Sequence, residues 1–254
     1  MKRFLLLFIL SVPAAPAWAE TPLVAVASNM THALKDIVEQ YRKAEGKNVK
    51  LTFGSSGNFT RQIQQGAPYD VFLSAAESYV AILAEKKLLA GEPRAYVHGR
   101  IGFFIPDNSS LRETTNLAEL FNRMHYGDYR RIAIANPEHA PYGIAAEQAL
   151  QNGGVWSISK SKLMIAENAA QVAQYVLSGG VDAGIIPESF TRLPMIRKNG
   201  RFLAIPETLH QPITHYLAVL KGSGQAGKDF VTYLYGKNAM SILLKYGYSM
   251  AETE

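Results

Sequence analysis

Residues 23–57 read LVAVASNMTHALKDIVEQYRKAEGKNVKLTFGSSG and predict a strand, a helix and a second strand in that order. Residues 23–27 form a short apolar run with β-branched side chains, which is typical of a buried strand. Over residues 31–44 apolar side chains recur at helical spacing, and Gly46 then provides a helix-ending signal. Residues 49–53 resemble a second strand. The stretch therefore predicts a β–α–β unit.

The same alternation continues along the chain. The helix that follows the second strand is expected to begin at Asn58 or Thr60. Further strands are expected at residues 71–73, 100–105, 132–135, 163–166, 183–186, 202–205 and 215–220. Strict alternation favours parallel sheets with helices on both faces. A single α/β domain often stops near 150 residues, so a chain of 254 residues predicts two lobes. Because no linker is visible, we expect strands to pass between them.

The composition is that of an ordinary folded protein and excludes several classes of function. Hydrophobic residues make up 48% and charged residues 19% of the chain, far from the composition of a disordered protein. The net charge of +5 is too mild for a nucleic-acid-binding face. The absence of cysteine excludes a disulfide framework, a cysteine-ligated zinc site and a thiol nucleophile.

Residues 1–19 have the three-part pattern of a secretory signal peptide. Lys2 and Arg3 precede an apolar run over residues 4–12, and small residues then end in AWA at residues 17–19. The run is shorter than the roughly 20 apolar residues that span a bilayer, and no later segment is apolar enough to cross one. We therefore expect cleavage after residue 19 and export of the mature protein.

Polar residues follow the expected strands at the points where helices begin. Ser28 and Asn29 follow the first strand, GSSGN follows the second, and similar junctions stand at residues 136–143 and 167–170. A helix N-terminus offers free N–H groups and a partial positive charge, and serine adds an O–H donor. Several such junctions at one cleft would form an anion site without a counter-charge. The plainer alternative is that these residues only cap their helices.

Other chemistries receive less support. The segment GSSGN at residues 54–58 nearly meets the G-x-S-x-G nucleophile motif but fails by register. The six histidines include no H-x-x-x-H pair, and we interpret them as scattered over the surface or behind a site. An exported hydrolase that uses Ser55 or Ser56 stays an alternative. It requires a histidine base, and the sequence reveals neither a base nor an orienting acid.

Six segments of the chain carry a more specific signal. They read VAVASNMTHALKDI, FGSSGNFTRQIQQGAPYDVFLSA, IANPEHAPYGIAAEQAL, AENAAQV, GGVDAGI and KYGY. In these segments, which follow the family order and cover nearly the whole mature chain, the sequence resembles the periplasmic molybdate-binding protein family. That family comprises the ABC-importer receptors for molybdate and tungstate.

The resemblance implies the fold of a type II periplasmic binding protein. In this α/β fold each of two lobes is a mixed sheet flanked by helices, and the ligand lies in the cleft between them. We expect lobe 1 to comprise residues 20–98 and 213–254, and lobe 2 residues 99–212. The resemblance also implies a monomeric periplasmic binding protein and not an enzyme. Its partners would be an ABC permease and its ATPase, with no nucleic acid and no cofactor besides the ligand.

The resemblance further implies the residues that hold the ligand. The family binds molybdenum only as the oxyanion, through hydroxyl and backbone N–H donors without lysine or arginine. Carried over junction by junction, these donors are Ser28, Asn29, Ser56, Tyr142 and Ala169. The family pattern can also place a tyrosine two residues after the end of the segment GGVDAGI. This chain has Pro187 there, which offers neither N–H nor hydroxyl. We therefore hypothesise that the Tyr142 hydroxyl replaces that donor.

A pocket that contains donors alone favours oxyanions that carry no proton. A protonated oxyanion would bring an O–H without an acceptor, and an unmet buried polar group costs about 1–3 kcal/mol. Molybdate, tungstate and sulfate all pass this test, so cavity size has to separate them. A different anion, such as sulfate or a carboxylate, therefore stays open as the ligand. The family resemblance, and not the donor count, selects molybdate.

Overall fold

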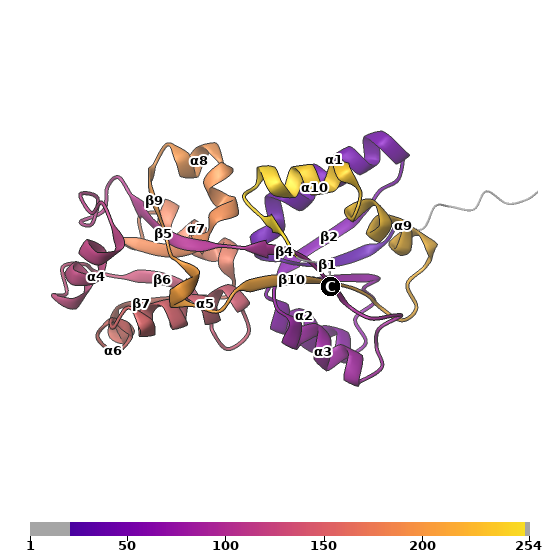
Figure 1. The fold of residues 1–254 in the computed structure, drawn as a ribbon, viewed down its shortest axis with the longest axis horizontal. Coiled ribbons are helices and arrows are strands. Elements are labelled where there is room, and N and C mark those ends of the chain that lie inside the picture. Colours follow the sequence, from indigo (N-terminus) through magenta and orange to yellow (C-terminus); the bar gives the residue numbers. More distant parts are fainter. Residues whose placement is uncertain (1–20, 252–254) are drawn as a thin grey trace, which may run out of the picture.

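The computed structural model describes residues 21–251, which form two sheets flanked by helices (Figure 1). The signal peptide expected at residues 1–19 lies outside the described residues. The first sheet contains, from edge to edge, β11 (Ser249–Met250), β4 (Arg94–Gly99), β10 (Ile213–Val219), β3 (Val71–Ser74), β1 (Leu23–Ala27) and β2 (Lys50–Gly54). The second contains β7 (Leu163–Ala166), β6 (Ile132–Ala135), β8 (Ala183–Pro187), β5 (Ile101–Pro106) and β9 (Gly200–Ala204).

Both sheets are mixed. Strand β1 runs parallel to β2 and β3, whereas β10 is antiparallel to β3 and β4. In the second sheet β6 is parallel to β7 and β8, and β5 is antiparallel to β8 and β9. Strict alternation predicted parallel sheets, and this prediction is correct only for the β–α–β part of each sheet. The mixed sheets implied by the family resemblance are confirmed.

Helices cover both faces of each sheet. The first sheet packs against α1 (Thr31–Glu45), α2 (Ser56–Gln64), α3 (Glu77–Glu85), α9 (Gln225–Leu234) and α10 (Lys237–Lys245). The second packs against α4 (Leu117–His125), α5 (Pro141–Asn152), α6 (Trp156–Ser159), α7 (Ala169–Leu177) and α8 (Pro194–Arg197). Short 3-10 helices are η1 (Ser28–Met30), η2 (Lys160–Lys162), η3 (Glu188–Arg192) and η4 (Glu207–Leu209). Among the described helices, none is long and apolar enough to cross a membrane.

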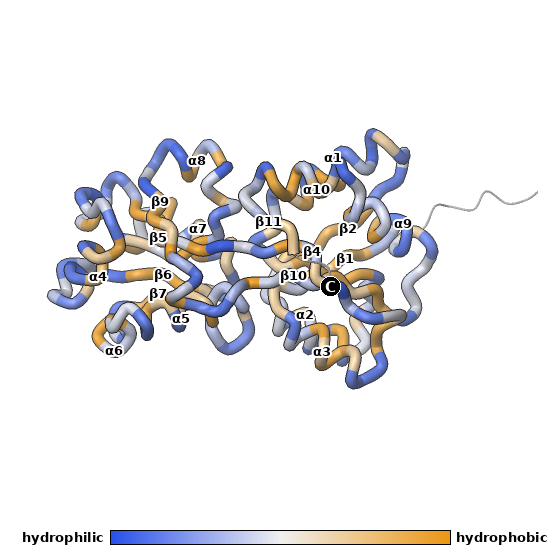
Figure 2. The backbone as a smooth tube through the Cα atoms, viewed as in Figure 1, coloured by the Kyte–Doolittle hydropathy of each residue, from blue (hydrophilic) through white to orange (hydrophobic). Residues whose placement is uncertain are grey.

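The core follows the alternation of side chains along each strand. Val24 and Val26 of β1 pack in one cluster with α1, α9 and α10, while Ala25 packs in another with α2 and α3. In the second sheet Ile134 faces α4 and α5, and Ala133 faces α7 and α8. Figure 2 shows hydrophobic residues concentrated on the strands that lie between the helix layers. The sheets are therefore apolar on both faces, which leaves polar chemistry to the strand ends.

The chain passes between the sheets by continuous backbone. Strand β4 leads into β5 across Arg100, and the segment after β9 returns to β10 (Figure 1). We propose that the lobes divide as the sequence suggested, and we call residues 20–98 and 213–254 lobe 1 and residues 99–212 lobe 2. Strands β4 and β10 pair with each other at this boundary, Gly99 opposite Ile213. The two connections therefore form one paired hinge.

Helix α2 begins earlier than expected. The sequence placed its start at Asn58 or Thr60, but the first helical residue is Ser56. The reason is that Ser55 adopts an extended conformation, with φ −84° and ψ 147°, and turns the chain directly into the helix. The first turn of α2 therefore carries the serine of the second junction.

Candidate functional site

One small pocket lies between the lobes, where strands from both sheets end. All five residues expected to bind an oxyanion line it, namely Ser28, Asn29, Ser56, Tyr142 and Ala169. Sequence reasoning had raised Ser55 only as a nucleophile and had left out Asn168, yet both also line the pocket. None of the described residues around the pocket carries a formal charge.

Four strand-to-helix junctions build this pocket. In lobe 1, β1 ends at Ala27 and η1 follows, while β2 ends at Gly54 and α2 follows. In lobe 2, β6 leads to α5 and β7 leads to α7. Each helix directs its first N–H groups and the positive end of its dipole to this region. The pocket is therefore electrostatically suited to an anion although no charged side chain lines it.

The Ser28 and Ser56 hydroxyls do not cap their helices. Ser56, which is fully buried, accepts a hydrogen bond at Oγ from the backbone N–H of Ala75 at 3.0 Å. Ser28 Oγ lies 3.4 Å from the N–H of Ala170 in lobe 2. The capping alternative is therefore wrong for these two serines, since neither junction has a side-chain cap. Each hydroxyl oxygen already accepts a hydrogen, which leaves the O–H hydrogen available to the pocket.

At the fourth junction capping does occur. Asn168 is the N-cap of α7, and its Oδ1 accepts from the N–H groups of Ala170 and Gln171 at 3.0 and 3.2 Å. The side chain of Asn168 thus occupies the N–H of Gln171 and shares the N–H of Ala170 with Ser28 Oγ, which lies farther from it. The N–H of Ala169, the first residue of the helix, is the donor that sequence reasoning assigned to the site.

Tyr142 reaches from lobe 2 to lobe 1. Its hydroxyl oxygen accepts a hydrogen bond from Asn29 Nδ2 at 3.2 Å. Burial raises the pKa of Tyr142 well above its ordinary value, so the hydroxyl keeps its proton at neutral pH. A Cβ atom at Gly99 would collide with this hydroxyl. A glycine at the hinge therefore leaves space for the tyrosine.

A buried polar network lies behind Asn29. The amide nitrogen of Asn29 lies 2.7 Å from His215 Nε2 and 2.9 Å from the Tyr248 hydroxyl, which in turn donates to the Asn29 carbonyl at 3.0 Å. Burial lowers the pKa of His215 to about 3, so the ring is neutral. The two amide hydrogens of Asn29 are thus shared among three neighbours, and the Tyr142 hydroxyl is the most distant of them. His215 is completely buried at the hinge and belongs to the histidines expected behind a site.

A second histidine bridges the lobes. His139 Nδ1 lies 2.8 Å from Ser55 Oγ, and His139 Nε2 lies 3.7 Å from Glu167 Oε2. Neither a base nor an orienting acid for Ser55 was visible in the sequence, and the structure places His139 beside Ser55 and Glu167 beside His139. The loop before α5 brings together residues that lie 84 positions apart, which no local pattern could reveal.

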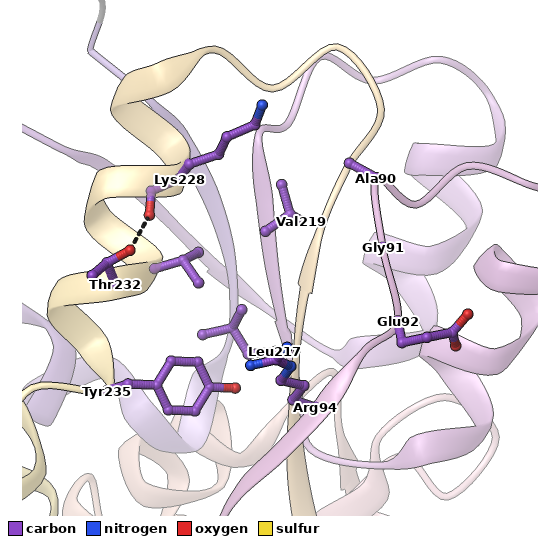
Figure 3. A pocket seen from close by; sticks show the side chains of 10 residues that line it. Ala90, Gly91, Glu92, Arg94, Leu217, Val219, Lys228, Thr232 and Tyr235 are labelled. Carbon is purple, nitrogen blue, oxygen red and sulfur yellow. Dashed lines mark hydrogen bonds between the residues drawn. The ribbon is translucent and has the colours of Figure 1, made fainter.

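A larger hollow of about 480 Å³ lies elsewhere on lobe 1 (Figure 3). Helix α9 forms one side of it and residues 90–94 the other, with Leu217 and Val219 between them. Charged and apolar side chains mix there, and none of the five expected residues takes part. Among the residues that the structure describes, no group of three or more histidines and acids is arranged to hold a metal ion.

The relatives of this chain are solute-binding proteins. Residues 22–249 match the family described as bacterial extracellular solute-binding proteins. The chain is 32% identical to the molybdate-binding protein ModA of Azotobacter vinelandii, with 93% of each protein covered. It is 30% identical to ModA of Escherichia coli strain K12, with 89% of this chain and 88% of that protein covered.

Two solved structures of binding proteins share the fold of this chain. The Azotobacter vinelandii periplasmic molybdate-binding protein superposes with a TM-score of 0.82 at 25% identity, over 91% of this chain and all of that one. The sulfate-binding protein SubI of Mycobacterium tuberculosis H37Rv superposes with a TM-score of 0.71 at 14% identity, over 91% of this chain and 87% of that one. The second likeness concerns the fold alone.

Burial of His215 predicts a loss of stability in acid. Its pKa of about 3 in the folded chain lies below the unfolded value of about 6.5, so below pH 6.5 only the unfolded chain binds this proton. Stability is therefore lost as the pH falls from about 6.5 towards 3. Between pH 7 and pH 5 we expect wild type to lose about 2 kcal/mol more than His215→Phe, measured by urea unfolding.

His125→Gln provides the control, because His125 is exposed on α4. This variant should follow the wild-type pH dependence. If His215→Phe and wild type lose the same free energy of unfolding between the two pH values, burial of the neutral ring does not govern acid stability.

Proposed function

Since this chain belongs to the family of bacterial extracellular solute-binding proteins, we propose that it captures molybdate and delivers it to an ABC importer. Its relatives are binding proteins, which favours binding over the hydrolase alternative. The ligand is cargo, and no separate cofactor is implied. We further propose that the protein acts as a periplasmic monomer, exported by the cleavable segment at residues 1–19, and that an ABC permease with its ATPase receives the ligand.

One observation carries the proposal. Three hydroxyls, those of Ser28, Ser56 and Tyr142, come from three junctions and line one pocket. The Ser56 oxygen accepts from the N–H of Ala75, and the Ser28 and Tyr142 oxygens lie within 3.4 Å of N–H groups that they share with other acceptors. A hydroxyl whose oxygen accepts a hydrogen bond keeps its own hydrogen free to donate, so these O–H groups are suited to bind an anion.

We propose the following ligand set. Ser28, Ser56 and Tyr142 donate through their hydroxyls, and Asn29 and Ala169 donate through backbone N–H groups at helix starts. Pro187 ends β8 and lies outside the pocket lining, which is consistent with a loss of the donor at that position. Tyr142 then replaces it from the opposite junction.

The choice of anion rests on sequence relatives and not on the fold. A sulfate-binding protein shares the fold at 14% identity, so the architecture serves more than one oxyanion. The pocket itself favours an anion, because it offers hydroxyl and helix N-terminal donors and, among the described residues, no carboxylate lines it. Among dianions the relatives at 30% and 32% identity favour molybdate, and tungstate has the same charge and shape.

Binding should raise the melting temperature strongly. A ligand that binds only the folded chain adds about 4 kcal/mol at a thousandfold excess over its Kd. For a protein of this size we expect an increase of about 8–16 °C with molybdate or tungstate. Differential scanning fluorimetry with equal concentrations of molybdate, tungstate and sulfate measures this. Equal shifts with all three anions would contradict discrimination by size, and no shift with any would contradict the function.

Removal of the Ser56 hydroxyl tests the first proposed donor. A hydrogen bond to a charged group is worth about 1.5–3 kcal/mol, so Ser56→Ala should weaken molybdate binding about ten- to a hundredfold. Isothermal titration calorimetry measures the Kd. Ser78→Ala, at a serine that lies outside the pocket lining, should leave the Kd unchanged. An unaltered Kd for Ser56→Ala would remove this residue from the site.

Tyr142→Phe tests the replacement of the donor lost at Pro187. The substitution keeps the ring and removes only the O–H, so we expect at least a tenfold loss of affinity, about 1.4 kcal/mol. Tyr129→Phe is the matched control, since Tyr129 is also buried in lobe 2 but donates to Ser159 at 2.9 Å, away from the pocket. Equal Kd values for Tyr142→Phe and wild type would show that the ring only lines the wall.

A further inference from the structure

The contact between Ser55 and His139 has no role in the ligand set proposed above. Ser55 lines the pocket and is 3% exposed, and its hydroxyl has His139 Nδ1 as its hydrogen-bond partner at 2.8 Å. Ser55 belongs to lobe 1 and His139 to lobe 2. The Ser55 hydroxyl could therefore serve as a sixth donor. The direction of its hydrogen depends on His139 of the opposite lobe.

Further contacts hold His139 against lobe 1. The N–H of Gly57 donates to the His139 carbonyl at 2.9 Å, and a Cβ at Gly57 would lie 2.8 Å from that of His139. Glycine is thus required for the two loops to approach. Asn58 of lobe 1 donates to Glu167 of lobe 2, and Arg61 donates to Asn58. All these contacts cross the gap between the lobes or support those that do, so they form when the lobes close.

The protonation state of His139 decides what the Ser55 hydroxyl does. In the neutral ring the single N–H is favoured at Nε2, because that nitrogen faces the Glu167 carboxylate at 3.7 Å. Nδ1 then accepts, and the Ser55 hydrogen is directed to His139. In the charged ring Nδ1 carries a hydrogen and donates to Ser55 Oγ. The Ser55 hydrogen is then released for the pocket that this residue lines.

We propose that His139 is a positioning residue of the oxyanion site, whose proton uptake turns the Ser55 hydroxyl into an additional donor to the bound anion. The inference rests on the proposed function. The proton comes from a solvent acid and forms an N–H bond at His139 Nδ1, the acid loses that proton, and no other covalent bond changes. The charged groups around the ring are Glu167, the adjacent Glu138, and Arg61 through Asn58.

Proton-linked binding provides the test. Histidine is the side chain that ordinarily changes charge between pH 5 and pH 8. We expect molybdate to bind about tenfold more tightly at pH 5.5 than at pH 8. This change in affinity is what one added hydrogen bond to a charged group contributes. Calorimetric titrations at pH 6.5 in two buffers of different ionisation enthalpy should also show net proton uptake on binding.

Two variants separate this role from a structural one. His139→Gln should bind with no proton uptake, and Ser55→Ala should lose most of the gain in affinity at pH 5.5. Glu113→Gln, at an exposed carboxylate that pairs with Arg112, should keep both properties of wild type. Thermal unfolding of each variant checks the fold, and Ser55→Ala carries the test if His139→Gln does not fold.

The outcomes are distinguishable from those of the proposed function. If wild type binds neither molybdate nor tungstate, the function itself is wrong and this inference with it. If wild type binds with the same Kd at both pH values and takes up no proton, only the role of His139 is overturned. Full retention of the pH effect in Ser55→Ala would likewise exclude the Ser55 hydroxyl as the added donor.

Discussion

The pocket depends on the direction in which a few hydroxyl hydrogens point. Serine and tyrosine hydroxyls can donate or accept, so a row of them has no preference for an anion by itself. In this protein the oxygens of Ser28, Ser56 and Tyr142 each lie within hydrogen-bond distance of an N–H group, which leaves their own hydrogens free to donate into the pocket. Helix N-termini add polarity of the same sign. A dianion therefore finds a preorganised set of donors, although no cation lines the site.

The topology makes this arrangement depend on closure of the lobes. Ser28 of lobe 1 receives its hydrogen bond from Ala170 of lobe 2, and Tyr142 of lobe 2 receives its own from Asn29 of lobe 1. Each lobe thus orients a donor of the other. The paired hinge strands set the distance, and Gly99 leaves the space that the tyrosine needs. Orientation of donors and closure of the cleft are for this reason the same event, which couples ligand affinity to lobe position.

Local patterns in the sequence predicted the strand-to-helix junctions, and the family resemblance selected five residues at them, all of which line the pocket. The junctions after β1, β2, β6 and β7 follow from short apolar runs and helix signals, and the family resemblance assigned roles to them. Strand β4 was not foreseen, because the sequence RAYVHG mixes charged and apolar residues and has no clear period. The partners behind the site were also missed. Asn29 contacts His215 and Tyr248 at separations of 186 and 219 residues, and only the assembled fold brings these together.

The Ser55–His139–Glu167 arrangement contains the residue types of a hydrolytic triad, yet its setting favours control of a donor over catalysis. A nucleophilic serine needs an exposed oxygen next to a bound carbonyl and a base that stays in place through the reaction. Here the serine is 3% exposed, and its base belongs to the other lobe, so the pair depends on how the two lobes are placed. Protonation of the imidazole changes the direction of the Ser55 hydroxyl hydrogen. Through this change it affects how strongly the anion is held.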